Sequence, residues 1–233
     1  MSDIFDEVRE DLRAERARRL WARYGGFLAG LAVVVLLGVG GFQAWRWNEN
    51  RKAEATGTAF LDAHRATEAG GTGADLAVLA RRFEGVAEAA PVGYRTLARL
   101  RAAALRSEAG DLDGALAEWD RIANDGDVDG LYRDLASLLW VLHGLDRTDP
   151  ARLAARIEPL TAEGSTWRAS ARELSALVAM RRGDPEAARR TLQTLAADAA
   201  APQGIRDRAG RLLAQLPPAP IPPASATPAA PQG

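Results

Sequence analysis

The strongest constraint on the fold is an aspartate that recurs at a nearly fixed interval. Asp75, Asp111, Asp149 and Asp184 are separated by 36, 38 and 35 residues. Each is a favourable N-cap, and the positions 4, 8 and 11 residues further on share one helix face. All twelve of those positions hold apolar residues: Leu79, Phe83, Val86, Ala115, Trp119, Ile122, Leu153, Ile157, Leu160, Ala188, Leu192 and Leu195. The pattern therefore predicts four helices of one design, each beginning just after its aspartate.

An Ala-rich helix is predicted before each of these four, at 53–68, 92–109, 130–143 and 166–182. Gly110 and Gly183 stand where a left-handed residue would end the first helix, directly before the capping aspartate. A helical hairpin cannot bury both of its apolar faces alone, so neighbouring hairpins must stack. A last helix at about 203–215 is expected to cover the end. The predicted fold class is an all-α solenoid of about four helical hairpins.

Prolines interrupt the helical pattern at two places. Pro159 lies near the end of the helix that follows Asp149 and is expected to kink it. Residues 217–233 hold seven prolines and no charge, so they are predicted to be a disordered Pro/Ala-rich tail. Such a tail has no specific role or is a ligand for a partner's polyproline-binding groove.

A second constraint is the uncharged apolar stretch from Tyr24 to Trp45. Twenty-two helical residues extend roughly 33 Å, and a membrane's hydrocarbon core is about 30 Å thick. Aromatic residues that favour the membrane interface flank the stretch: Trp21, Tyr24, Trp45 and Trp47. We therefore expect a cytoplasmic tail at 1–23, a transmembrane signal-anchor helix at 24–47 and a repeat domain at 48–216.

The cations beside the stretch predict its orientation. On the far side stand Arg46, Arg51 and Lys52, whereas residues 13–23, directly before the stretch, hold five arginines: Arg13, Arg16, Arg18, Arg19 and Arg23. By the positive-inside rule the N-terminus stays in the cytoplasm and the repeat domain lies across the membrane. A cleaved signal peptide is the alternative, with a small-x-small site at 38–40. The long apolar run and the acidic head favour an uncleaved anchor.

Two shorter patterns near the stretch have open interpretations. Ile4, Val8 and Leu12 form a narrow apolar strip, which belongs to a solvated helix or docks on a membrane surface or a partner. Gly26 and Gly30 form a GxxxG step, which has no specific role or lets a partner membrane helix approach closely.

The residues that would carry chemistry are missing or isolated. The chain has no cysteine, which removes thiolate ligands, thiol nucleophiles and disulfides. Neither His64 nor His143 has a second ligand at metal-binding spacing, and His143 is interpreted as a helix C-terminal residue favoured by the dipole. The segment NDGDVDG at 124–130 resembles the start of a calcium loop. However, the twelfth position from Asp125 is Ala136 and not Glu, which favours a solvated turn.

The sequence also lacks a nucleophile elbow, a phosphate loop and a dinucleotide-binding glycine pattern. The net charge of −1 gives no reason to expect nucleic acid. We therefore predict no catalytic, metal-binding or cofactor-binding residue, no cofactor and no small-molecule substrate; the chain is not expected to be an enzyme.

Charge is unevenly distributed along the predicted repeats. Residues 108–149 hold eleven acids and three arginines, and residues 152–211 hold eleven arginines and seven acids. This bias either steers partners electrostatically or is an ordinary mixed surface.

The segments GDLDGALAEWDRIA (110–123) and GDPEAARRTLQTLA (183–196) resemble the second helices of tetratricopeptide repeats. Ala115 and Ala188 stand where that repeat has a small residue, and Trp119 and Leu192 where it has a large ring. The first helices depart from the repeat consensus because they lack its large aromatic residues.

Together with the acidic leader, the Arg-rich run and the apolar stretch, the layout is similar to the YfgM family. The members of that family are ancillary subunits of the SecYEG translocon, and their repeat domain is shared with cell-division coordinator proteins. The resemblance implies a single-pass inner-membrane protein whose periplasmic domain binds translocon subunits, periplasmic chaperones or unfolded clients. The alternative is a scaffold for envelope growth or cell division that binds through the same groove.

Overall fold

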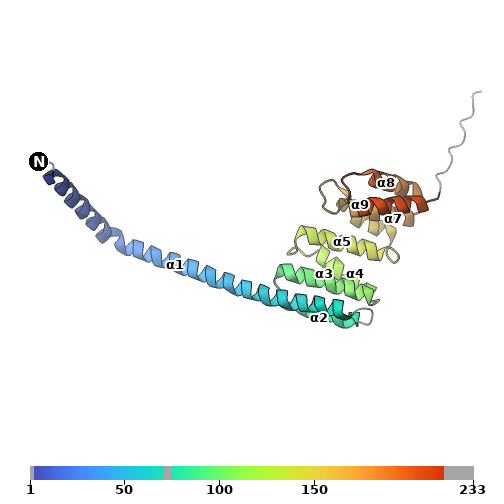
Figure 1. The fold of residues 1–233 in the computed structure, drawn as a ribbon, viewed down its shortest axis with the longest axis horizontal. Coiled ribbons are helices and arrows are strands. Elements are labelled where there is room, and N and C mark those ends of the chain that lie inside the picture. Colours follow the sequence, from blue (N-terminus) through green and yellow to red (C-terminus); the bar gives the residue numbers. More distant parts are fainter. Residues whose placement is uncertain (1–2, 71–74, 218–233) are drawn as a thin grey trace, which may run out of the picture. The chain divides into compact units, whose positions relative to one another are not determined.

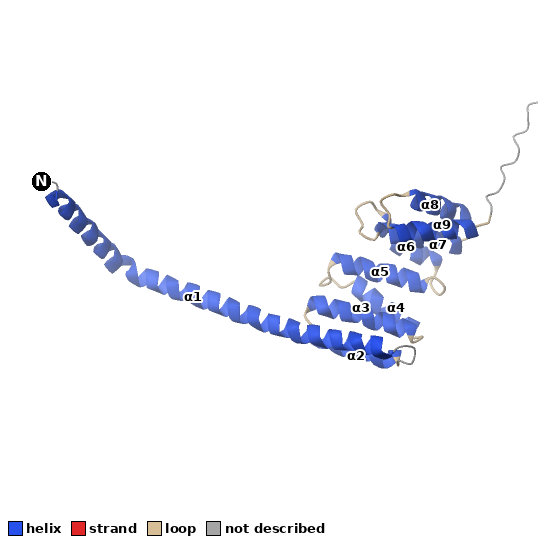
Figure 2. Ribbon diagram, in the orientation of Figure 1, coloured by secondary structure: helices blue, strands red, loops and turns tan. Residues whose placement is uncertain are grey.

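The computed structural model describes residues 3–70 and 75–217; up to position 32 it describes side chains only at 22, 26, 27, 30 and 31. The described residues form nine α-helices, one 3₁₀ helix and no strand, which confirms the all-α prediction (Figure 2). The chain divides into two compact units, Met1–Ala55 and Thr56–Gly233, and each is considered by itself.

The first unit contains most of one long helix, α1 (Asp3–Gly70). The last turns of α1, from Thr56 onward, belong to the second unit. Its composition of Ala, Leu, Arg and Glu favours a helix, and no proline interrupts it. In the part of the chain that the structure describes, no helix is both long and apolar enough to cross a membrane.

The second unit is a series of helices in which each packs on the next (Figure 1). The end of α1 and helices α3, α5 and α7 are the predicted first helices of the hairpins, and α9 is the predicted last helix. The bounds after α1 are α2 (Leu76–Ala89), α3 (Val92–Glu108), α4 (Leu112–Ala123), α5 (Gly130–Gly144), α6 (Pro150–Ile157), the 3₁₀ helix η2 (Glu158–Thr161), α7 (Arg168–Arg181), α8 (Pro185–Ala197) and α9 (Gln203–Gln215).

The four recurring aspartates are N-caps, as predicted. Each side chain accepts a hydrogen bond from a backbone N–H in the first turn of α2, α4, α6 or α8. The twelve side chains at offsets 4, 8 and 11 are all buried. One polar contact therefore fixes the start of each second helix, and one apolar face fixes its packing.

The turns at Gly110 and Gly183 have the predicted left-handed backbone, with φ of +90° and +76°. At the first turn, the N–H of Gly110 donates to the Ser107 carbonyl at 3.1 Å and the N–H of Asp111 donates to the Arg106 carbonyl at 2.9 Å. The same two bonds close the turn at Gly183. Each is a Schellman turn, which satisfies two carbonyl groups at the end of the preceding helix.

The structure corrects the expectation that Pro159 kinks its helix. Helix α6 ends at Ile157, and the chain continues as the 3₁₀ turn η2, with Pro159 in its first positions. Proline cannot supply the N–H that a continuing α-helix needs, so the helix stops instead of bending. As a result α6 has 8 residues, whereas α2, α4 and α8 have 14, 12 and 13.

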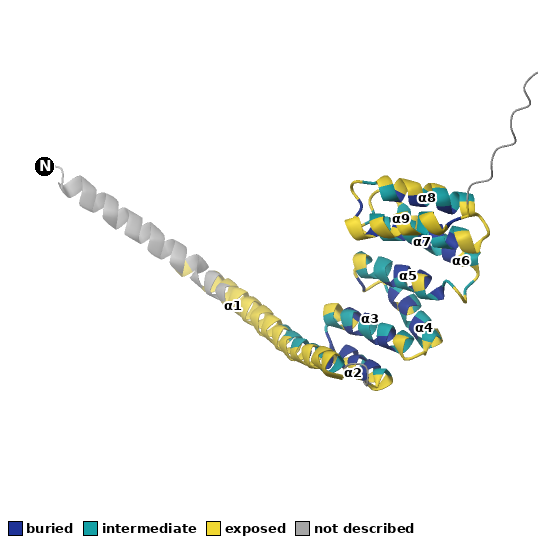
Figure 3. Ribbon diagram, turned by 45° about the vertical axis from the view of Figure 1, so that its right-hand side comes forward, coloured by how far each residue is buried: buried dark blue, intermediate teal, exposed yellow. Residues whose placement is uncertain are grey.

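The second unit has three apolar clusters in series. The first surrounds Phe83, which Phe60 of α1 meets edge-on at 5.3 Å between ring centroids. The central cluster surrounds Trp119 and Leu153, and the last surrounds Leu192 at the contact of α7, α8 and α9. Figure 3 shows the buried positions where neighbouring helices meet. Many of these positions are alanines, which let the helices approach closely.

Candidate functional site

The predicted membrane-interface residues are described only at the C-terminal end of the apolar stretch. Trp45 and Trp47 are 61% and 60% exposed, and the Arg51 guanidinium lies 4.3 Å from the centroid of the Trp47 ring. The side chains of Trp21, Tyr24 and the five topology-setting arginines (Arg13, Arg16, Arg18, Arg19, Arg23) lie outside the described residues.

Apolar side chains of the stretch that the structure describes are uncovered. Phe27, Leu36 and Leu37 are 72%, 70% and 71% exposed. A Cβ atom placed on Gly26 or Gly30 would meet nothing within 4 Å. No described side chain therefore packs against the GxxxG step, and its two interpretations stay open.

His143 lies in the last turn of α5, as predicted, but its surroundings are not those of a dipole-stabilised cation. Its ring stacks on Trp119 of α4 at 4.6 Å, and its Nδ1 is 3.1 Å from the hydroxyl of Ser107 on α3. Burial lowers the pKa of His143 below its usual range, and the charge of Glu108 only partly opposes this. The expected stabilisation by the helix dipole requires a charged ring, so a neutral packing role replaces it.

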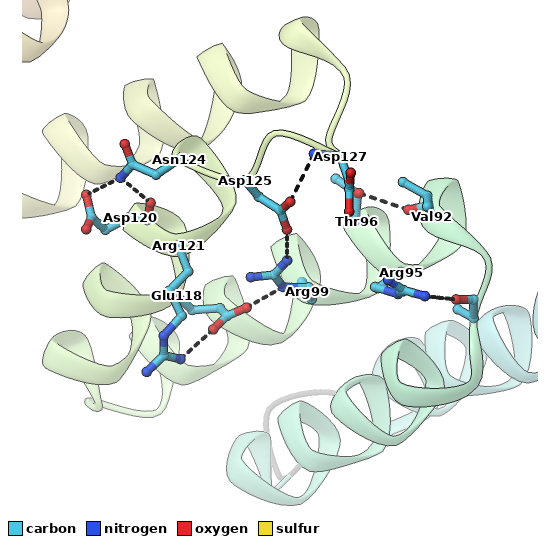
Figure 4. A network of polar contacts seen from close by, with 11 residues as sticks. Val92, Arg95, Thr96, Arg99, Glu118, Asp120, Arg121, Asn124, Asp125 and Asp127 are labelled. Carbon is cyan, nitrogen blue, oxygen red and sulfur yellow. Dashed lines mark hydrogen bonds and ion pairs between the residues drawn. The ribbon is translucent and has the colours of Figure 1, made fainter.

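The segment that resembles a calcium loop takes part in a network of hydrogen bonds and ion pairs (Figure 4). Arg99 of α3 donates to Glu118 of α4 at 2.6 Å and to Asp125 in the loop after α4 at 2.9 Å. The backbone N–H of Asp127 also donates to Asp125, and with Arg99 it holds the pKa of that carboxyl below its usual range. Asp125 thus fastens the loop to α3.

Several polar contacts join a hairpin to the next one at the period of the repeat. Arg147–Asp113, Arg181–Asp146 and Arg208–Glu173 are ion pairs between residues 34, 35 and 35 positions apart. Trp167 donates its indole N–H to the Leu131 carbonyl 36 positions earlier. These contacts therefore link each hairpin to the next across the repeat boundary.

One groove of the repeat domain lies between α2 and α4, with α3 as its floor; we call it the α2–α4 groove. It comprises two adjoining cavities of about 200 and 280 Å³, which share Glu84 and Arg106. Arg106 and Glu84 form an ion pair at 2.6 Å, and the floor residue Arg99 pairs with Glu118. Two arginines of this groove are thus neutralised within the fold.

A larger groove lies between α6 with η2 on one side and α8 on the other, with α7 as its floor; we call it the α6–α8 groove. Its two cavities measure about 590 and 360 Å³ and share Thr161, Ser175 and Thr191. Its arginines are Arg172, Arg182 and Arg190. Among the described residues, no ion pair crosses from α6 or η2 to α8.

A comparison with protein families agrees with three features of the fold: the repeat period, the capped second helices and the small residues at helix contacts. The tetratricopeptide repeat-like domain family matches residues 18–193. The chain belongs to this family. The match includes the apolar stretch and extends into α8. Searches among curated proteins and among solved structures found no match. Because stacked repeats offer extended binding surfaces, a tetratricopeptide repeat-like domain indicates a protein-binding scaffold.

The sequence did not single out the residues that line the α6–α8 groove. Two signals pointed toward it: the excess of arginine after residue 152, and Pro159, which ends α6 early. Neither signal identifies the lining residues, because they become neighbours only through the packing of α6, α7 and α8.

Proposed function

We propose that this chain is a membrane-anchored protein-binding scaffold with a periplasmic repeat domain. In this proposal it is an ancillary subunit of the SecYEG translocon that assists chaperones or clients during secretion. One observation carries the proposal: the tetratricopeptide repeat-like match extends over both the repeats and the uncharged apolar stretch of the same chain.

The anchoring part is supported by the apolar stretch from Tyr24 to Trp45. Its described side chains, such as Phe27 and Leu36, are exposed to a degree that favours contact with lipid or with a partner. Trp45 and Trp47 stand where interface residues are expected, and the guanidinium of the neighbouring Arg51 lies over the Trp47 ring. The arginine excess before the stretch supports a cytoplasmic N-terminus.

The binding part is supported by the repeat domain and by its absence of recognisable catalytic motifs. Anchoring confines the domain to the membrane surface and raises its effective concentration for segments that emerge there. We therefore propose a non-enzymatic role without a cofactor, in which translocon subunits, chaperones or unfolded clients are the partners.

Affinity purification of the full chain from membranes in mild detergent tests the partners. Translocon subunits and periplasmic chaperones are expected in the eluate; if both are missing while the chain itself is recovered, the translocon role is wrong. A fluorescent fusion that forms a band at midcell, instead of a uniform outline of the cell, would favour the division scaffold.

A reporter that is active only in the cytoplasm, fused after residue 216, tests the orientation. We expect no activity from this fusion and full activity from the same reporter placed before residue 13. Activity at residue 216 would overturn the periplasmic location.

A further inference from the structure

We propose that the α6–α8 groove binds an extended peptide segment that carries carboxylate side chains, with a carboxylate held at the end marked by Arg172 and Arg190. This inference rests on the proposed function as a protein-binding scaffold and specifies the chemistry of the partner. The partner is thus an acidic, extended stretch of another protein.

The charge of the groove is uneven along its length. The 360 Å³ cavity is lined by two arginines and four hydroxyl residues and by no carboxylate: Thr161, Arg172, Ser175, Arg190, Thr191 and Thr194. Among the described residues, Arg190 has no ion-pair partner. The nearest acid to Arg172 is Asp198 at 3.9 Å, and Arg168 binds that same carboxylate at 3.1 Å. Arg190 therefore presents positive charge that the fold leaves available, and Arg172 adds a cation whose acid partner is shared with Arg168.

The opposite end of the groove has a different balance. Arg182 lines the 590 Å³ cavity together with Glu158 and Asp184. Asp184 already caps α8 by accepting from the Ala187 N–H at 2.9 Å. A partner carboxylate is therefore best accommodated at the Arg172 and Arg190 end, where no acid of the lining opposes it.

The lining residues form stripes that suit an extended chain. Along α7 and its C-cap the stripe runs from Arg172 through Ser175 to Arg182, and ten helical residues span roughly 15 Å. An extended chain advances about 3.3 Å per residue, so the groove accommodates roughly four or five peptide residues. Hydroxyl groups such as Thr191 can both donate to and accept from a peptide backbone. The lining has no aromatic side chain that would select a flat ligand.

The two walls of the groove are not bridged. Helix α6 stops at Ile157 and η2 continues this wall to Thr161, while α8 forms the other wall with 13 residues. Between the preceding second helices, Arg156 of α6 pairs with Asp120 of α4 and bridges the gap. Among the described residues, no such ion pair joins α6 or η2 to α8. The face of α7 that forms the floor of the groove is therefore accessible to a partner.

The experiment measures binding of a short fluorescein-labelled peptide of alternating Glu and Ala to the full chain in detergent, by fluorescence anisotropy at low salt. We expect Arg190→Glu to weaken binding by about tenfold, because one attraction is lost and a repulsion is added, each worth a few-fold. The matched control is Arg81→Glu on α2. Arg81 and Arg190 are both exposed, and each lies six residues after its capping aspartate. The control should change affinity less than about twofold.

Charge reversal sharpens the test. A peptide of alternating Lys and Ala should bind Arg190→Glu more tightly than it binds the unmodified chain. The proposal is overturned if the Glu/Ala peptide does not bind, if a Gln/Ala peptide binds as well, or if Arg81→Glu and Arg190→Glu lose affinity equally. Full displacement by millimolar inorganic phosphate would instead assign the site to small anions. If the peptide binds but translocon subunits are missing from the purification, the proposed site stands and only the translocon role is wrong.

Discussion

The α2–α4 groove and the α6–α8 groove occupy equivalent places between second helices, but the fold uses their arginines differently. In the first, Arg99 and Arg106 are bound to acids of the same domain at 2.6 Å. In the second, Arg190 has no ion-pair partner among the described residues and lines a cavity without a carboxylate. The same repeat thus yields one groove in which Arg99 and Arg106 are paired within the fold and another in which Arg190 is available to a partner.

This difference indicates where function can be separated from stability. Changes at Arg99 or Arg106 in the α2–α4 groove should reduce the free energy of unfolding, because each removes an ion pair from a partly buried acid. Changes in the α6–α8 groove should alter binding while the domain stays folded. The predictions below test this division, and each is measured by urea unfolding of the full chain in detergent, followed by tryptophan fluorescence or circular dichroism.

The largest loss of stability is expected for Trp119→Ala, in the central apolar cluster. Trp119 is 0% exposed, and its ring stacks on His143. Removing a buried aromatic ring should lower the free energy of unfolding by about 3–5 kcal/mol. Circular dichroism is the suitable signal, because the substitution removes a tryptophan. A loss below about 1 kcal/mol would mean that α4 is not a central element of the domain.

A smaller loss is expected for Arg99→Met, which keeps the apolar part of the side chain. The change leaves Glu118 without its partner on α3, and Glu118 is only 16% exposed. Arg121 still pairs with the other oxygen of Glu118 at 2.8 Å, so the loss comes from the charge-assisted hydrogen bonds that Arg99 makes. Removing them should reduce the free energy of unfolding by about 1–3 kcal/mol. The double variant Arg99→Met with Glu118→Gln should recover part of this loss; no recovery would contradict a direct pairing.

His143 should make the domain less stable in mild acid. Burial lowers its pKa in the folded state, so the unfolded chain takes up the proton first as the pH falls below the ordinary value of about 6.5. The stability is therefore complete above that value and decreases as the pH falls toward the lowered pKa. Unfolding at pH 8 and pH 5.5 should show a smaller difference for His143→Gln than for the unmodified chain. Asp125, whose pKa is lowered, titrates below this window.

The smallest effect is expected for Arg190→Met in the α6–α8 groove. An exposed arginine without a partner should change the free energy of unfolding by less than about 0.5 kcal/mol. The comparison with Arg99→Met is direct, since the two variants make the same chemical change in two grooves. A loss as large as that of Arg99→Met would mean that Arg190 stabilises the fold and is not reserved for a partner.

The fold was largely predictable because its signals are local. An aspartate caps the helix that follows it, a glycine closes the turn before it, and a four-residue spacing places Ala115 and Trp119 on one face. These interactions lie within a few residues of one another, so the sequence alone suffices to place them. The resulting hairpin pattern agrees with the described helices of the second unit.

The grooves were not predictable because they depend on contacts between hairpins. Pro159 was expected to bend α6 and instead ended it, and only the three-dimensional packing shows which side chains of α6, η2, α7 and α8 line the groove. Similarly, His143 contacts Trp119 and Ser107, which lie 24 and 36 positions earlier in the chain. No local sequence pattern indicates these contacts. The pairing of Arg99 with Asp125 is of the same kind.

The three apolar clusters have a mechanical consequence. A domain with separate cores in series can open one block while the others stay closed, as expected for repeat arrays. Helix α7 belongs to two blocks, since Val178 packs in the central cluster and Ala176 in the last. A ligand lying across α6, α7 and α8 would clamp these blocks together. Binding should then convert stepwise unravelling of the C-terminal end into a single transition at higher force.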